Sequence, residues 1–242
     1  MSRTICWFSC GATSAVAAYL TLKRNPDAHI VYIDTGSEHP DNMRFLLDCQ
    51  RWYGKEIEII KSAKFNNVDE VIEKRRYLNG VTGAPCTGEL KKLPRMAYQQ
   101  PDDVHVFGFH TGERERTQRF QENNFELTIE TPLIDAMLDH NDCLAMLRTV
   151  GIEPPAMYKL GYHHANCLGC VKSSGAGYWN KIRVDFPDVF VRRADQERKF
   201  NHALVKVNGT PIFLDELPPD IGKYEAEPEQ ACSILCQIAL NQ

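Results

Sequence analysis

A short turn near the start of the chain carries residue types suited to binding an anion. Residues 9–14 read Ser-Cys-Gly-Ala-Thr-Ser and lie between the apolar run 5–8 and the small-residue segment 15–20. The first run is typical of a buried strand, and the second of a helix. Such a turn directs backbone N–H groups and the positive end of a helix toward one point, where a phosphate can bind. The alternative is an ordinary turn in which Ser14 caps the helix.

Polar residues also follow two later apolar runs. Asp34 ends the run 29–34 and is suited to accepting a hydrogen bond from a ribose hydroxyl, or to forming an Asx turn. Arg114, Arg116 and Arg119 follow the run 104–109. Their spacing suits a clamp on phosphate groups, although a charged helix start has the same pattern.

The chain is rich in cysteine, which favours metal binding or redox chemistry over disulfides in a reducing compartment. Apolar surroundings predict that Cys6, Cys49 and Cys143 are small core residues. All nine cysteines lie at positions 6, 10, 49, 86, 143, 167, 170, 232 and 236.

The clearest sulfur motif is the Cys-Leu-Gly-Cys segment at 167–170. A C-x-x-C loop allows two thiolates to converge on one metal or to form a redox pair. Cys86 is a candidate third ligand from a distant loop, an arrangement that iron–sulfur clusters accept. His163 and His164 precede the motif, so a mixed Cys/His zinc site is an alternative.

A second cysteine pair lies near the end of the sequence. Cys232 and Cys236 are four residues apart, which places them on one face of a helix. They are candidates for a further ligand or for the packing of a terminal helix.

Apolar runs and amphipathic segments alternate along the first 130 residues and predict a parallel sheet with helices on both faces. In such a sheet ligands bind beyond the carboxyl ends of the strands, so the turn at 9–14, Asp34 and the segment after residue 109 should be neighbours. The predicted strands are 4–8, 29–34, 56–60 and 104–109, and the predicted helices are 13–24, 40–53, 67–76 and 88–99. Beyond them we expect helices over 135–150 and 188–203 and a hairpin over 205–214.

Composition is that of a water-soluble globular protein. The 242 residues are 43% hydrophobic and 25% charged, with a net charge of −4, and no apolar run is long enough to cross a bilayer. The first predicted strand begins at residue 4, which leaves little room for a signal peptide, so we expect a cytoplasmic protein without membrane contact.

Several ordered segments together resemble the phosphoadenosine-phosphosulfate (PAPS) reductase family of adenine nucleotide alpha hydrolases, within the PP-loop ATP pyrophosphatase superfamily. Residues 9–14 are similar to the family's Ser-Gly-Gly-x-Asp-Ser loop, and residues 33–40 to its Leu-Asp-Thr-Gly-x-x-x-Pro stretch. Residues 86–94 are similar to Cys-Cys-x-x-x-Lys-x-x-Pro, and residues 111–114 to Thr-Gly-x-Arg. Residues 132–135 and 158–170, with the C-x-x-C motif, continue the resemblance over roughly 4–175.

The resemblance implies an α/β fold. We expect a parallel, Rossmann-like sheet of five or six strands with helices on both faces, plus a C-terminal helical and loop region that carries the C-x-x-C motif. The division we expect is a nucleotide-binding PP-loop domain over 1–135 and a cysteine-containing extension over 136–242, packed on the same domain.

The resemblance also implies roles for individual residues. The nucleotide-binding set is Ser9, Cys10, Gly11, Ala12, Thr13, Ser14, Asp34, Lys91 and Gly112. The catalytic set is Arg114, Arg116 and Cys232, and the ligands of a [4Fe-4S] cluster are Cys86, Cys167 and Cys170 with Cys236 or Cys232 as the fourth.

This chain departs from the family's pattern at informative positions. Cys10 and Thr13 replace a glycine and an aspartate of the loop, which places a sulfur atom close to the expected nucleotide. Thr87 replaces the second cysteine of the Cys-Cys pair, so one iron is left open or a C-terminal cysteine completes the set. An open iron would suit sulfur transfer. The segment around Cys232 is only a loose match to the Glu-Cys-Gly-Leu-His of the reductases.

Three functions follow from the resemblance. The first is an ATP pyrophosphatase with Mg²⁺ that activates an acceptor for sulfur insertion, as in tRNA thiolation and DNA phosphorothioation. Its partners would be a nucleic-acid acceptor, a sulfur donor such as a cysteine desulfurase and a second copy in a homodimer. The second is a reductase of APS or PAPS, in which Cys232 forms an S-sulfonate that thioredoxin reduces. The third is a nucleotide-binding protein without catalysis.

Overall fold

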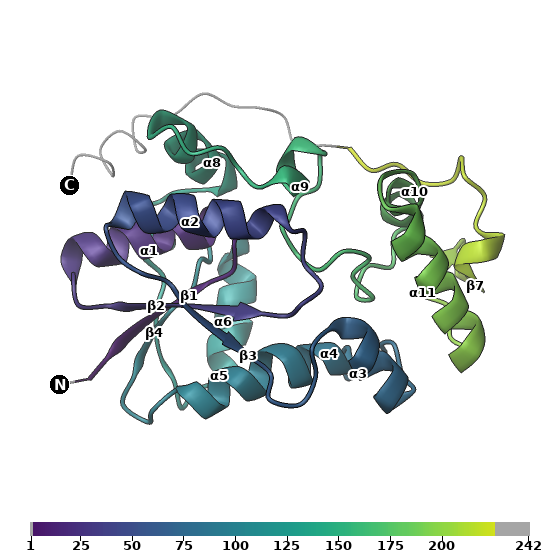
Figure 1. The fold of residues 1–242 in the computed structure, drawn as a ribbon, viewed down its shortest axis with the longest axis horizontal. Helices are drawn as coiled ribbons and strands as arrows, with labels where there is room; N and C mark the ends of the chain where they lie inside the picture. Colours follow the sequence, from purple (N-terminus) through teal and green to yellow (C-terminus); the bar gives the residue numbers. More distant parts are fainter. Residues whose placement is uncertain (1, 226–242) are drawn as a thin grey trace.

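A five-stranded parallel sheet forms the centre of the computed structural model, which describes residues 2–225 (Figure 1). The strands lie in the order β3-β2-β1-β4-β5. Cys6 of β1 pairs with Ile30 of β2 on one side and with Val106 of β4 on the other. The strand bounds are β1 (Thr4–Phe8), β2 (His29–Asp34), β3 (Glu58–Lys61), β4 (Val104–Val106) and β5 (Thr128–Glu130). The predicted α/β fold with a parallel sheet is confirmed.

Helices cover both faces of this sheet, as expected for apolar strands. One face packs on α1 (Ala12–Arg24), α2 (Asp41–Tyr53) and α8 (His140–Thr149), and residues such as Phe8 and Phe45 fill this core. The other face carries Ile5, Trp7 and Val31 and lies against α5 (Leu93–Tyr98) and α6 (Arg114–Glu122). Figure 1 shows α1 and α2 above the sheet and α5 below it.

A second core lies beside the sheet, around the fully buried Trp179. It is built from elements on both sides of residue 135 in the sequence, so the packing does not follow the predicted division into 1–135 and 136–242. The division into two domains stays a prediction. Its elements are α3 (Val68–Arg75), α4 (Pro85–Thr87), the π-helix η1 (Gly88–Lys92), α10 (Ala176–Asp185), α11 (Pro187–Phe200), β6 (Val205–Val207), β7 (Thr210–Ile212) and the 3₁₀-helix η3 (Leu214–Glu216). The short helix α7 (Pro132–Asp135) belongs to the first core through Leu133, whereas α9 (Ala156–Lys159) contacts both cores, through Tyr158 and Met157.

Some predicted element bounds are wrong for identifiable reasons. The helix expected over 135–150 begins only at His140, because Met137 has a left-handed backbone (φ 56°) and a capping box between Asp139 and Asp142 starts a new helix. The strand expected over 104–109 ends at Val106, and the chain then bends toward α1. The helix expected over 188–203 ends at Phe200, where Asn201 is left-handed. The strand expected over 56–60 lies at 58–61.

The sheet has five strands, within the five or six that the resemblance implies, but the position of β5, the α9 and α10 helices and the break of the 88–99 helix into η1 and α5 were not predicted. These elements are short or irregular, and their periodicity is correspondingly weak.

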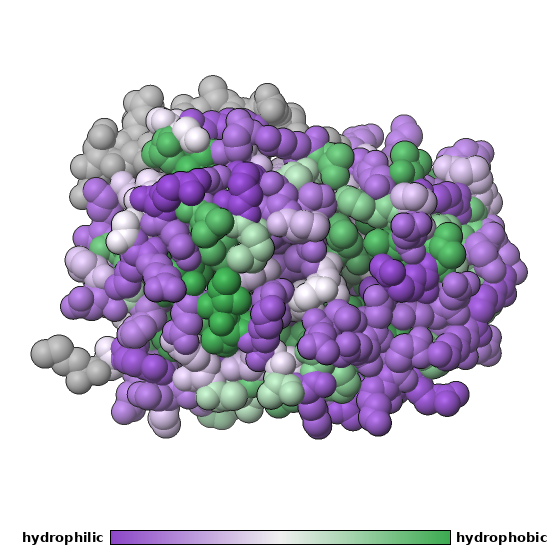
Figure 2. Space-filling view, in the orientation of Figure 1, coloured by the Kyte–Doolittle hydropathy of each residue, from purple (hydrophilic) through white to green (hydrophobic). Residues whose placement is uncertain are grey.

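The surface is mostly polar, with some exposed apolar side chains. Met43 and Leu47 of α2 are 40% and 47% exposed, and Figure 2 shows apolar surface over this part of the molecule. Within residues 2–225, none of the helices combines the length and apolar character needed to cross a bilayer.

A buried carboxyl group ties α11 to the segments that follow it. Glu197 is fully buried, and its two carboxylate oxygens accept hydrogen bonds from the backbone N–H groups of Leu204 and Leu214. Burial raises the pKa of Glu197 to about 7, and the two amides oppose this shift only in part.

This pKa predicts a pH-dependent stability. The folded state binds the proton more tightly than the unfolded chain, so the contribution of Glu197 is complete below about pH 4.5 and is lost as the pH rises toward 7. We expect the free energy of unfolding to fall by about 2–3 kcal/mol between pH 5 and pH 8 from this group. Urea unfolding at both pH values measures it. Glu197→Gln should remove this part of the pH dependence, while replacing the exposed Glu122 by glutamine should leave it in place; an unchanged slope in Glu197→Gln would contradict the assignment.

Candidate active site

The sheet has a topological switch point between β1 and β4. The chain continues from β1 to β2 on one side, whereas β4 lies on the other side of β1. In sheets of this order ligands bind beyond the carboxyl ends of the strands at the switch point. Residues 9–14 follow β1 and residues 107–113 follow β4, so both segments lie there. They are in close contact, because a Cβ added to Gly108 would lie 2.7 Å from the backbone nitrogen of Ser14.

The turn after β1 presents open backbone amides. Helix α1 begins at Ala12, and its N-cap Gly11 makes no side-chain capping bond with the residues that the structure describes. Ser14 is therefore inside the helix and is not its N-cap. Its hydroxyl donates to the Gly11 carbonyl (2.9 Å) and accepts from the Ser9 N–H (3.0 Å), which holds the turn closed. The first-turn amides and the helix dipole remain directed toward the switch point, as an anion site requires.

The sulfur of Cys10 points away from this turn. The residue is fully buried, and its Sγ lies 3.5 Å from the Asn42 carbonyl oxygen of α2. Burial raises the pKa of the Cys10 thiol far above its ordinary value. The left-handed backbone of Cys10 (φ 54°) turns its side chain into the core, and a contact between its sulfur and a nucleotide stays a prediction.

Asp34 takes part in two local contacts after β2. One carboxylate oxygen accepts from the Gly36 N–H (2.8 Å), which is the Asx turn considered as an alternative, and the other pairs with Lys61 of β3 (2.8 Å). A bond to ribose stays a prediction.

Three cysteines from two distant parts of the sequence lie close enough to interact electrostatically, beside the loop after β2. Cys86 lies in α4, and Cys167 and Cys170 lie in the loop before α10. The Cys167 sulfur is 3.2 Å from the Thr35 hydroxyl, and the Cys170 N–H donates to the Tyr178 hydroxyl (2.9 Å). Since β2 is the neighbour of β1, this three-cysteine site lies next to the switch point.

Lys91 brings a positively charged ammonium to the three-cysteine site. Burial lowers the pKa of Lys91, but Cys167, Glu38 and then the other two thiols outweigh it, and the net shift is upward. Burial raises the pKa of Cys167 to about 11, and Lys91 opposes that shift. Lys91 was predicted to bind nucleotide, and the structure places it against the thiols and Glu38.

Glu38 is a site residue that sequence reasoning missed. Its side chain is 6% exposed, and it lies 3.7 Å from the Lys91 ammonium. It also accepts from the Tyr32 hydroxyl (2.6 Å) and the Asn42 amide (3.1 Å). The sequence offered one signal for Glu38, a carboxylate within the motif-bearing stretch 34–40. Its burial could not be predicted, because it depends on these tertiary partners.

The loop that carries Cys167 and Cys170 is fixed by a buried arginine of α11. The Arg193 Nε donates to the Gly169 carbonyl (3.0 Å), and its guanidinium pairs with Asp69 of α3 and with Gln196. Gly169 is left-handed (φ 59°), and a Cβ there would meet Val189 at 2.5 Å. The backbone between the two cysteines is therefore held in one conformation.

Cysteine thiolates are the usual protein ligands of iron–sulfur clusters, and Cys86, Cys167 and Cys170 are residues of this type. In the part of the chain that the structure describes, however, no three His, Cys, Asp or Glu side chains form a closed metal-binding group. His163, a residue of the zinc alternative, stacks on Tyr224 and contacts the Glu225 carbonyl (2.6 Å). Cys232 and Cys236, the remaining predicted ligands, lie outside the described residues.

Comparison with known proteins decides the family. A profile described as the phosphoadenosine phosphosulfate reductase domain matches residues 3–176, well over half of the chain. The chain belongs to this family. Its sequence is 24% identical over 223 residues to an uncharacterized protein of Methanocaldococcus jannaschii, covering 88% of this chain and 52% of that protein. The chain thus spans about half the length of this curated relative.

A solved member of the PAPS reductase family has the same fold. The phosphoadenylyl-sulfate (PAPS) reductase from Candida auris, in a phosphate complex, superposes with a TM-score of 0.52 over 69% of this chain and 82% of the other, at 15% identity. The likeness to this structure is one of fold. The predicted site residues stay predictions.

The arginines predicted from the PAPS reductase motif lie at the switch point. Arg114 and Arg116 are exposed at the start of α6, and Arg116 is paired with Glu113. The Gly112 N–H donates to the His110 ring, which closes the turn before α6. The guanidinium of Arg119 instead donates to its own helix, at the Glu115 carbonyl.

Cys10 allows a direct test of this altered PP-loop. We expect Cys10→Gly to leave the dissociation constant for ATP within about twofold of the wild type, because the sulfur faces the core. Glycine adopts the left-handed backbone conformation without strain, which stabilises the folded state by about 0.5–1 kcal/mol. Alanine at position 10 keeps that strain. The two variants should therefore differ in the free energy of unfolding by that amount. A large loss of ATP binding in both, measured by calorimetry, would show that the sulfur contributes.

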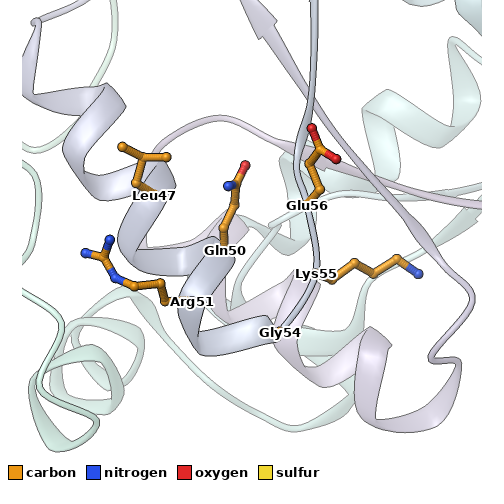
Figure 3. Close-up of a pocket in the computed structure, with 6 residues that line it drawn as sticks. All are labelled: Leu47, Gln50, Arg51, Gly54, Lys55 and Glu56. Atoms are coloured by element: carbon orange, nitrogen blue, oxygen red, sulfur yellow. The ribbon is translucent and has the colours of Figure 1, made fainter.

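A shallow pocket elsewhere on the molecule does not belong to this site. Figure 3 shows its lining around the end of α2, including Leu47, Gln50 and Glu56. It lies between the C-terminus of α2 and the start of β3, at the amino end of the strands. It is therefore at the opposite edge of the sheet from the switch point.

Proposed function

We propose that this enzyme uses ATP to activate an acceptor for sulfur insertion. The observation that carries the proposal is that the thiols of Cys86, Cys167 and Cys170 all interact electrostatically with the Lys91 ammonium, one strand away from the turn at 9–14. A nucleotide bound at the switch point would thus be next to a site rich in thiols.

Residues of this chain supply the groups that bind and neutralise the phosphates when ATP activates the acceptor. An acceptor oxygen bonds to the α-phosphorus, pyrophosphate leaves, and sulfur then displaces AMP from the activated acceptor. The amides of the turn at 9–14 would bind the phosphates, and Arg114 and Arg116 would balance the charge that develops on them. Mg²⁺ would accompany ATP, as is usual for nucleoside triphosphates.

The thiols would hold an iron–sulfur cluster. Cys86, Cys167 and Cys170 are three ligands, and Cys232 or Cys236 is the fourth unless one iron stays open. When bound, such a cluster would supply an iron able to carry sulfide. A nucleic acid is the proposed acceptor and a cysteine desulfurase the proposed sulfur donor, for a cytoplasmic protein that forms a homodimer.

Membership of the PAPS reductase family supports a second candidate, a reductase of APS or PAPS. The Cys232 thiolate would attack the sulfur of bound APS or PAPS, and the S–O bond would break with AMP or adenosine 3′,5′-bisphosphate as the leaving group. The thioredoxin dithiol would then reduce the resulting S-sulfonate and release sulfite.

One experiment separates the two functions. Anaerobically purified protein is incubated with ATP, sulfide and either bulk tRNA or plasmid DNA, and in parallel with PAPS or APS and thioredoxin. AMP and pyrophosphate release that survives Cys232→Ser supports ATP-driven sulfur insertion. Sulfite release that is lost in Cys232→Ser supports the reductase. Neither product in either mixture would contradict both.

A further inference from the structure

Exposed basic side chains border the three-cysteine site on two sides. On one side, Lys74, Arg75 and Arg76 lie at the end of α3, which is next to α4 (Figure 1). On the other side, Lys172 follows Cys170 by two residues and is exposed. We call Lys74, Arg76 and Lys172 the basic rim.

Hydrogen bonds bring the two sides of the basic rim together. The Asn79 side-chain amide, which follows α3, donates to the Val171 carbonyl. The Ser173 N–H donates to the Cys170 carbonyl (2.9 Å) and closes a turn. In this turn Val171 is buried and Lys172 is exposed. The segment after α3 therefore lies against the turn that carries Lys172.

Neighbouring carboxylates do not neutralise the basic rim. Its three side chains form no ion pair with any residue among 2–225, whereas Arg75 is paired with Glu89 of η1. The chain as a whole has a net charge of −4, so this excess of positive charge is a local feature. The acidic side chains of α3 are all engaged elsewhere: Asp69 with Arg192 and Arg193, Glu70 with Asn66, and Glu73 with Lys199.

An aromatic ring lies beside the basic rim. Tyr77 directly follows Arg76 and is 36% exposed, and its ring centroid is 6.2 Å from that of His202. Cations that bind phosphates, together with an aromatic ring on which a base stacks, are the two features with which proteins bind single-stranded nucleic acids. An acidic peptide would use the cations but has no base for the ring.

We propose that the basic rim and Tyr77 bind an unpaired stretch of a nucleic acid, with its phosphates on the three cations and a base against the Tyr77 ring. Since Lys172 is two residues from Cys170, a strand bound here lies beside the thiols proposed to supply sulfur. This inference rests on the proposed nucleic-acid acceptor and assigns a surface to it.

Fluorescence anisotropy on the anaerobically purified full chain tests the proposal. The probes are labelled single strands of about 20 nucleotides with the same sequence, one of RNA and one of DNA. We expect the triple variant Lys74→Gln/Arg76→Gln/Lys172→Gln to bind at least about tenfold more weakly than wild type at ~0.1 M salt. The slope of log affinity against log salt should fall by about 2, because each phosphate contact to a single strand contributes about 0.7. Either probe satisfies the proposal, and the tighter one identifies the preferred nucleic acid.

The Tyr77 ring has a separate signature. Tyr77→Ala should weaken binding about tenfold at an unchanged salt slope, because stacking releases no counterions. Tyr77→Phe keeps the ring and should bind as wild type does. Full affinity in Tyr77→Ala would contradict a base at this position.

A matched control removes three cations from the opposite edge of the sheet. Lys23→Gln and Arg24→Gln at the end of α1, combined with Lys55→Gln before β3, change the net charge by the same amount. This variant should keep the affinity and the salt slope of wild type. An equal loss here would show that binding follows overall charge and would overturn the assignment. Equally tight binding of a labelled polyglutamate peptide would overturn it as well.

The remaining outcomes distinguish the basic rim from the proposed function. If the triple variant is folded by circular dichroism and binds both probes as wild type does, the rim does not bind the acceptor. If it fails to fold, Lys172→Gln replaces it, with an expected loss of about 0.7 in the slope. If wild type binds neither probe, the rim and the nucleic-acid acceptor both fail. AMP release from ATP is measured in the same samples, and its absence alongside binding through the rim would contradict ATP activation alone.

Discussion

Replacing Gly108 by alanine is expected to weaken ATP binding at least about tenfold, or about 1.4 kcal/mol. A Cβ at Gly108 would lie 2.7 Å from the Ser14 nitrogen, 2.8 Å from its Cα and 2.9 Å from the Thr13 carbonyl carbon. These are backbone atoms of the first turn of α1, which cannot move aside as a flexible side chain would. The alanine must therefore displace the amides that we propose to bind phosphate, and small displacements in such sites have large effects.

Gly175→Ala is the matched control for this variant. Gly175 is the N-cap of α10, its φ is −80°, and a Cβ there meets nothing within 4 Å. We expect it to bind ATP like wild type. Calorimetry on both variants checks the prediction, and wild-type affinity in Gly108→Ala would show that the loop after β4 does not set the position of the PP-loop.

Replacing Arg193 by methionine is expected to lower the free energy of unfolding by about 3 kcal/mol. The Arg193 side chain is 2% exposed and serves three partners: the Gly169 carbonyl, Asp69 and Gln196. Methionine fills much of the volume but leaves these groups without their donor. Because Gly169 lies between Cys167 and Cys170, the loss should also loosen the three-cysteine site.

The neighbouring arginine provides an internal control. Arg192 pairs with the same Asp69 (3.1 Å), but its side chain is 49% exposed. Exposed ion pairs contribute little, so Arg192→Met should lower the free energy of unfolding by less than about 1 kcal/mol. Urea denaturation measures both variants, and equal effects would contradict the assigned role of the buried arginine.

The sheet and its helices could be predicted from sequence because their signals are local. The runs at 4–8 and 29–34 are apolar enough to be read as buried strands, and both have those bounds in the structure. The alternation of strands and helices then implies a parallel sheet and a ligand edge. The 9–14 turn and the segment after β4 meet at this edge because the topology requires it.

The rest of the site depends on tertiary contacts that no local pattern reports. Cys10 is the clearest case, because its sulfur turns inward through a left-handed backbone at a position where the family's motif has glycine. The role of Glu38 depends on the distant Lys91.

The most direct test of the central claim is the iron and acid-labile sulfide content of the protein purified without oxygen. We expect both in the wild type, with an absorbance shoulder near ~400 nm. We expect their loss in each of Cys86→Ala, Cys167→Ala and Cys170→Ala, and their retention in Cys49→Ala, which alters a cysteine buried in the core. Wild-type protein without iron and sulfide, or iron and sulfide kept in all three variants, would contradict a sulfur site at these cysteines.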